Sequence, residues 1–124
     1  MTKPLALVFY ENLLPGSQLI NRLQDLGYRV LSFHDGYLLE DQAEREKPLV
    51  IVTDLFSKRD DVCGAIKKLR NNPKTKHIPV LAFIAQENAE LQQRALASGA
   101  NLIANASGIL EQLPQLLAQV LEVE

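Results

Sequence analysis

The sequence is poor in the features that mark several protein classes. Cys63 is the only cysteine, so neither an intrachain disulfide nor a cysteine-based metal site is expected. The longest apolar runs, such as residues 78–85, are too short to span a bilayer. The first residues are not followed by a signal-like apolar stretch and cleavage site. We therefore expect a cytoplasmic protein without a membrane segment.

An excess of charge of one sign is also missing. The chain has 13 basic and 15 acidic residues and a formal net charge of −2, which provides no general field that attracts nucleic acid. The basic residues between Lys67 and Lys76 have no interleaved aromatic residues, and we interpret them as a solvated face. The length of 124 residues predicts one domain, residues 1–124.

What the sequence does contain is a fivefold alternation of short apolar runs with amphipathic stretches. This alternation is typical of an α/β protein with a doubly wound parallel sheet. Strands are predicted at residues 5–9, 28–33, 49–53, 79–84 and 102–104. Helical spacing of apolar residues follows each strand, and the last helix is expected to begin near residues 112–114, with Pro114 in its first turn. The second strand is more amphipathic than the others, so we expect it at a sheet edge.

Ligands of such sheets gather beyond the carboxyl ends of the strands. The residues at these ends are Tyr10 and Glu11, Asp54, Ile84 and Ala85, and Asn105 and Ala106. Glu11 and Asp54 are the only carboxylates among them, and oxygen ligands of this kind suit Mg²⁺. Because two carboxylates make a poor site, we expect weak Mg²⁺ binding at best and no other cofactor.

Three segments carry a resemblance to a known family. Residues 49–70 run from an apolar strand through Asp54 into an amphipathic helix without an insertion, Ile78-Pro79-Val80-Leu81 forms another strand, and residues 94–101 contain a Gly-Ala pair between a helix and a strand. In these segments and over nearly its whole length, the chain resembles response-regulator receiver domains of two-component signalling. The resemblance implies a flavodoxin-like (βα)5 fold with strand order 2-1-3-4-5.

The resemblance also implies roles for the strand-end residues. In the family, an acidic pair holds Mg²⁺, an aspartate accepts the phosphoryl group, a Ser or Thr hydrogen-bonds it, and a lysine pairs with it. The corresponding residues here are Tyr10 with Glu11, Asp54, Ile84 and Ala106. We expect the Tyr10 ring to fill the pocket that a metal would occupy. Because attack by a carboxylate on phosphorus needs neutralising groups, the sequence predicts a pseudo-receiver with impaired phosphorylation.

The same residues also fit other interpretations. Asp54 is equally well interpreted as a cap of the following loop or helix. It is also interpretable as an unusual phosphoacceptor that uses a cation from Lys58 or Arg59. A small-molecule-binding flavodoxin-like module is the weakest alternative, because the first loop lacks a Gly-rich phosphate-binding motif.

The favoured hypothesis is a non-enzymatic signalling module that binds a protein partner or a second copy of itself, and neither nucleic acid nor a membrane. In the resembled family the docking surface comprises the fourth helix, the fifth strand and the fifth helix. Here it includes Gln92, Gln93, Ile103 and Gln119. Ile103 stands where the family usually has an aromatic switch residue, so the usual hydroxyl-aromatic switch is not expected to operate.

Overall fold

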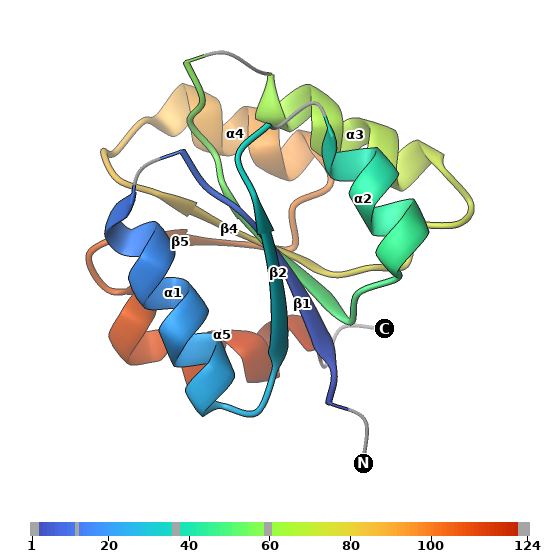
Figure 1. Ribbon diagram of the computed structural model, residues 1–124. Coiled ribbons are helices and arrows are strands. Elements are labelled where there is room, and N and C mark those ends of the chain that lie inside the picture. The colour runs from blue at the N-terminus through green and yellow to red at the C-terminus, as the bar shows by residue number, and fades with distance from the viewer. Residues whose placement is uncertain (1–2, 12, 36–37, 59–60, 122–124) are drawn as a thin grey trace.

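The computed structural model describes residues 3–11, 13–35, 38–58 and 61–121. Its centre is a parallel sheet in the order β2-β1-β3-β4-β5 (Figure 1). The strands are β1 (Leu5–Phe9), β2 (Arg29–Phe33), β3 (Val50–Asp54), β4 (Val80–Ile84) and β5 (Leu102–Asn105). The predicted strand order and fold class are therefore confirmed.

Burial along the strands follows their place in the sheet. Every residue of β1, β3 and β4 is buried, as expected for central strands that are covered on both faces. The strands β2 and β5 are only partly buried and form the two edges. The amphipathic character of residues 28–33 thus correctly predicted an edge strand.

Helices cover both faces of the sheet, as Figure 1 shows. One core cluster joins the sheet to α2 (Leu39–Glu46), α3 (Val62–Asn71) and α4 (Ala89–Ser98). The other joins it to α1 (Leu13–Asp25) and α5 (Ile109–Leu121). The five strands are parallel, so all of them begin at one end of the sheet and finish at the other. Segments that precede the strands therefore gather at one end, and segments that follow the strands gather at the opposite end.

The helix α5 begins earlier than expected. It starts at Ile109 rather than near Gln112, which places Pro114 inside the helix. Proline has no N–H and leaves the carbonyl four residues earlier, that of Leu110, without its intrahelical donor. Arg22 of α1 donates from Nε to this carbonyl oxygen at 3.4 Å. A tertiary contact thus replaces the hydrogen bond that Pro114 removes, and it ties α1 to α5.

Arg70 at the end of α3 joins three segments of the chain. Its Nε donates to the carbonyl of Gly99 at 2.9 Å, and its Nη1 donates to the carbonyls of Lys76 and Ile78 at 2.8 and 2.7 Å. Its Nη2 donates to Oδ1 of Asn101 at 2.6 Å. Burial lowers the pKa of Arg70, but a guanidinium stays charged in proteins. Arg70 therefore stabilises the connections into β4 and β5.

Two apolar residues are less buried than their spacing suggested. Leu96 of α4 is 55% exposed, and Leu26 lies beyond the last residue of α1. Both residues continue the helical spacing of apolar residues in the sequence, but only tertiary packing decides which residues at the margin of an apolar helix face are covered. No helix in the described part of the chain has the length and apolar character needed to cross a membrane.

Candidate functional site

Asp54 is the last residue of β3 and is held at the carboxyl end of the sheet between β1 and β4. Its side chain is almost completely buried, and the residue is 7% exposed. Its Oδ1 accepts a hydrogen bond from the Phe56 N–H at 3.0 Å. The preceding residue, Thr53, donates its hydroxyl to the Asp54 carbonyl at 3.0 Å. Asp54 therefore caps the turn that leaves β3, which is one of the two roles expected for it.

The pKa of Asp54 is raised from its ordinary 3.8 to about 6. The main cause is burial, which penalises the charged carboxylate. The hydrogen bond from the Phe56 N–H opposes the rise, and the negative charge of Glu11 adds to it. The carboxyl group consequently takes up a proton at a pH where an exposed aspartate is ionised.

Glu11 lies beside this site and braces the loop after β3. Its carboxylate accepts hydrogen bonds from the Ser57 hydroxyl and, at 3.2 Å, from the Lys58 N–H. The structure thus brings Glu11 and Asp54 together at one end of the sheet, close enough for the charge of Glu11 to influence Asp54. The Glu11 oxygens, however, already accept hydrogen bonds from the protein.

The carboxylates of Glu11 and Asp54 do not fit a tight site for a divalent cation. Mg²⁺ binds through several oxygen ligands in near-octahedral geometry. Within the described ranges, no group of three or more His, Cys, Asp or Glu side chains is arranged to hold a metal ion. Each Glu11 oxygen already accepts a hydrogen bond from the loop after β3, which leaves fewer lone pairs for a cation. Mg²⁺ binding through Glu11 and Asp54 stays a prediction of weak affinity.

Tyr10 follows β1 at the carboxyl end of the sheet. Its ring is buried within the core shared with α1 and α5 and meets the His34 ring edge-on, with 4.6 Å between the ring centroids. A Cβ added at Gly16 would come within 2.2 Å of the Tyr10 ring. Because Gly16 has no side chain, the ring packs against α1. That the ring fills the space of a metal site stays a prediction.

A pocket of about 320 Å³ opens beside Asp54. Its walls include Phe56, which is 52% exposed, together with Ile84 and Leu91. None of the described residues that line it is basic, and Glu87 adds a second acid to Asp54. The pocket therefore offers an approaching anion neither a cation nor a hydroxyl.

The residues after β5 also supply no cation. The Ala106 N–H donates to the Ile84 carbonyl at 2.9 Å. The Asn105 side chain accepts hydrogen bonds from both the backbone N–H and the hydroxyl of Ser107, at 3.0 and 2.9 Å. The Ser107 hydroxyl is thus used to close its own turn. Ala106, the residue after β5, has no polar group in its side chain.

Some residues of the site escaped the sequence reasoning. Phe56 and Ser57 contact the two carboxylates, and residues 86–88 complete the pocket. Loops have no periodicity, so no spacing rule predicts such contacts. The only signal in the sequence was the short interval between Asp54 and Ser57, which places Ser57 near the end of the strand. Lys58 engages Glu11 through its backbone N–H, and Arg59 lies outside the described residues.

The candidate docking surface surrounds the β5 edge of the sheet. Gln93 and Gln119 are exposed on α4 and α5, while Gln92 and Ile103 are partly buried. Ile103 packs against the core beneath α4. Because β5 has a neighbour on one side only, this edge is open to a partner.

Comparison with solved structures identifies the architecture. The receiver domain of the sensor histidine kinase PA1611 from Pseudomonas aeruginosa is 21% identical, with 98% of this chain and 100% of that chain covered and a TM-score of 0.88. That structure has a magnesium ion coordinated in its active site cleft. The chemotaxis protein CheY4 from Vibrio cholerae is 23% identical, with 96% and 99% covered and a TM-score of 0.85. The chain has the receiver-domain fold.

The same fold is found at lower identity. The receiver domain of the response regulator NarL from Mycobacterium tuberculosis is 16% identical, with 100% of both chains covered and a TM-score of 0.84. No protein-family model and no curated protein matches the sequence. In this receiver fold, Asp54 and Ile84 are the last residues of β3 and β4, while Glu11 and Ala106 follow β1 and β5.

Proposed function

We propose that the chain is a cytoplasmic, receiver-like signalling module of the two-component type that is not an enzyme, has impaired phosphorylation, and acts by binding a protein partner or a second copy of itself. The observation that carries this proposal is the pocket beside Asp54. Asp54 supplies a carboxylate there, but the described lining contains a second acid and no basic residue.

Energetic arguments support the proposed impairment of phosphorylation at Asp54. The loss of one electrostatic stabiliser of a transition state commonly costs about 10²–10³ in rate, and a hydrogen bond to a charged group contributes about 1.5–3 kcal/mol. Ile84 cannot donate a hydrogen bond, and Ala106 cannot supply a charge. We therefore expect transfer to Asp54 to be slow and the phosphorylated form to be poorly held.

Incubation with a small phosphodonor and Mg²⁺, followed by intact-mass measurement, tests the chemical part of the proposal. The expected result is no stable gain of a phosphoryl group. A stoichiometric gain that Asp54→Asn abolishes would show instead a working, unusual phosphoacceptor. The proximity of Glu11 and Asp54 is what keeps this alternative worth testing.

The interaction part of the proposal rests on the α4, β5 and α5 surface. Gln92, Gln93, Gln115 and Gln119 give it neutral polar side chains, and such side chains cost less to desolvate than charges. Introducing a charge there should weaken association without unfolding the domain. The state of Asp54 should matter little to the contact itself.

Sedimentation velocity or a pull-down with Gln119→Glu and Asp54→Ala separates these contributions. Gln18, exposed on α1, gives a matched control as Gln18→Glu. We expect only Gln119→Glu to reduce association while all variants melt like the parent. If only Asp54→Ala loses association, the pocket at the end of β3 is the functional site and the α4, β5 and α5 surface is not.

A further inference from the structure

A second hollow, of about 790 Å³, lies at the end of the sheet where the strands begin, opposite Asp54. We call it the basal basin and define it by Lys3, Arg29, Lys47, Leu49, Lys76 and His77. These residues come from segments far apart in the sequence, which the parallel strands bring to one end of the molecule. The basin is therefore a product of the fold.

The basin concentrates positive charge. Its described lining contains five basic residues, Arg70 among them, and one acidic residue, Glu46. The whole chain, in contrast, carries a formal net charge of −2. A surface that opposes the overall charge of its protein favours a particular orientation of charged partners.

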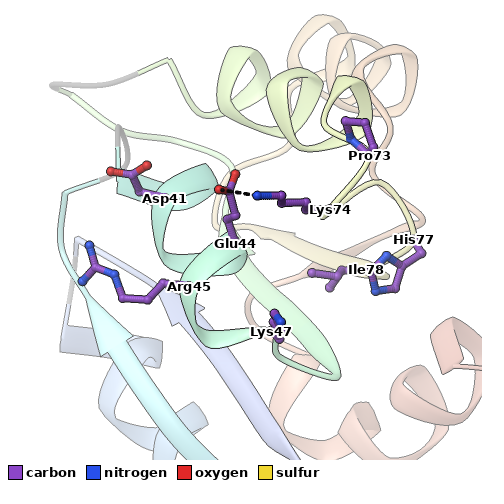
Figure 2. A pocket seen from close by; sticks show the side chains of 8 residues that line it. All are labelled: Asp41, Glu44, Arg45, Lys47, Pro73, Lys74, His77 and Ile78. Atoms are coloured by element: carbon purple, nitrogen blue, oxygen red, sulfur yellow. Dashed lines mark ion pairs between the residues drawn. The ribbon is translucent and has the colours of Figure 1, made fainter.

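The neighbouring hollow shows what a compensated surface looks like. It shares Lys47 and His77 with the basin but also contains Asp41 and Glu44, and Glu44 forms an ion pair with Lys74 at 3.7 Å (Figure 2). In the basal basin, none of the ion pairs between described residues involves a lining side chain. Among the described residues, therefore, no carboxylate pairs with the lysine ammonium groups of the basin.

Part of the lining is apolar, and we call this part the floor of the basin and the basic residues its rim. Leu49 is 46% exposed there, and Pro4, Pro48 and Pro79 also line it. Apart from His77, no described lining residue carries an aromatic ring, so stacking of nucleic-acid bases is not favoured. A bare phosphate group would contact the basic rim and leave Leu49 in water. The combination of basic rim and aliphatic floor fits a ligand that has both carboxylates and aliphatic side chains.

We propose that the basal basin binds an acidic peptide segment of a partner protein, with aliphatic side chains interspersed among its carboxylates. The carboxylates pair with Lys3, Arg29 and Lys76, and the aliphatic side chains cover Leu49. Because the basin and Asp54 lie at opposite ends of the sheet, this proposal does not depend on the state of Asp54 or on the α4, β5 and α5 surface.

Fluorescence anisotropy tests the proposal with the full chain and a fluorescein-labelled peptide of alternating glutamate and leucine. The double variant Lys3→Glu/Lys76→Glu should weaken binding by about tenfold or more. Its matched control, Lys67→Glu/Lys68→Glu, makes the same charge change at exposed positions of α3 outside the basin and should change binding by less than about twofold. Glu46→Gln should tighten binding. Equal weakening by both double variants, or none by the basin variant, would overturn the proposal.

A second peptide, with serine in place of leucine, tests the apolar floor. Leu49→Ser should weaken the leucine peptide by about threefold or more and leave the serine peptide unchanged. Displacement of the leucine peptide by tripolyphosphate at lower concentrations than by the serine peptide would indicate a phosphate site and refute the peptide assignment. Urea unfolding verifies that each variant is folded, and Arg29→Ala replaces the double variant if that one is not.

Discussion

Replacing Asp54 by asparagine is expected to change how the stability of the domain depends on pH. Burial and the charge of Glu11 raise the pKa of Asp54 in the folded protein to about 6, whereas the unfolded chain loses this proton near the ordinary value of 3.8. Between these values the folded state binds more protons than the unfolded state. The free energy of unfolding therefore falls as the pH rises through this window.

The size of the effect follows from the two pKa values. Their separation corresponds to about 3 kcal/mol. This stabilisation is fully present below about pH 4 and lost as the pH rises through about 6. The asparagine introduced by Asp54→Asn does not ionise, but its side-chain carbonyl can still accept the Phe56 N–H. At neutral pH we thus expect Asp54→Asn to be more stable than the parent.

Urea unfolding at about pH 4.5 and about pH 8 measures the effect as the difference between parent and variant at each pH. The chain contains no tryptophan, so the helical circular dichroism signal is the suitable probe. The exposed Asp25 at the end of α1 provides the matched control, Asp25→Asn. A difference that stays flat with pH for Asp54→Asn, or a parent that gains stability relative to this variant at higher pH, would refute the reasoning.

Single contacts elsewhere give further expectations. Arg70→Ala should lower the free energy of unfolding by about 3–5 kcal/mol, and Arg70→Lys should recover little of it, as measured in urea. Arg22→Ala should cost about 1 kcal/mol in the parent but less in a Pro114→Ala background, where the helix supplies its own donor; a double-mutant cycle measures this coupling. Lys47 has a φ of 51°, a left-handed conformation that glycine adopts without strain. Lys47→Gly should therefore raise the free energy of unfolding by about 1 kcal/mol, as measured by thermal unfolding. Calorimetric titration should show no submillimolar Mg²⁺ site, and a tight site lost in Glu11→Gln would contradict this.

The sheet was largely predictable from the sequence for a physical reason. Strands buried on both faces need uninterrupted apolar runs, and residues 5–9, 49–53 and 79–84 have them. The start of α5 was not predictable in the same way. The preference of proline for a first turn is a local rule, whereas the partner that makes Pro114 tolerable inside the helix, Arg22, is distant in sequence.

The site was predictable only in part. The positions of Glu11 and Asp54 follow from the ends of their strands, and the structure places them close enough for the charge of Glu11 to raise the pKa of Asp54. The contacts of each carboxylate depend instead on the loop after β3, whose backbone and Ser57 hydroxyl supply the donors. The position of the Tyr10 ring depends on the absence of a side chain at Gly16. Such contacts arise from tertiary geometry and leave no periodic pattern.

The basic residues between Lys67 and Lys76 show how a single pattern conceals several environments. Sequence reasoning treated them as one solvated face. In the structure, Lys67 and Lys68 are exposed on α3, and Lys74 pairs with Glu44. Arg70 is engaged with carbonyl and amide oxygens, and Lys76 joins the basal basin. Charge spacing along the chain therefore did not reveal which cation is available to a ligand.

The two ends of the sheet differ in charge, and this difference connects both proposals. Glu11, Asp54 and Glu87 place acidic groups at the carboxyl end, while the basal basin gathers cations at the amino end. Long-range charge distributions steer the approach of charged molecules. On the proposed function, the acidic groups around Asp54 disfavour the approach of an anionic phosphodonor. On the second proposal, an acidic partner segment binds instead at the basin, where Glu46 is the only carboxylate among the described lining residues.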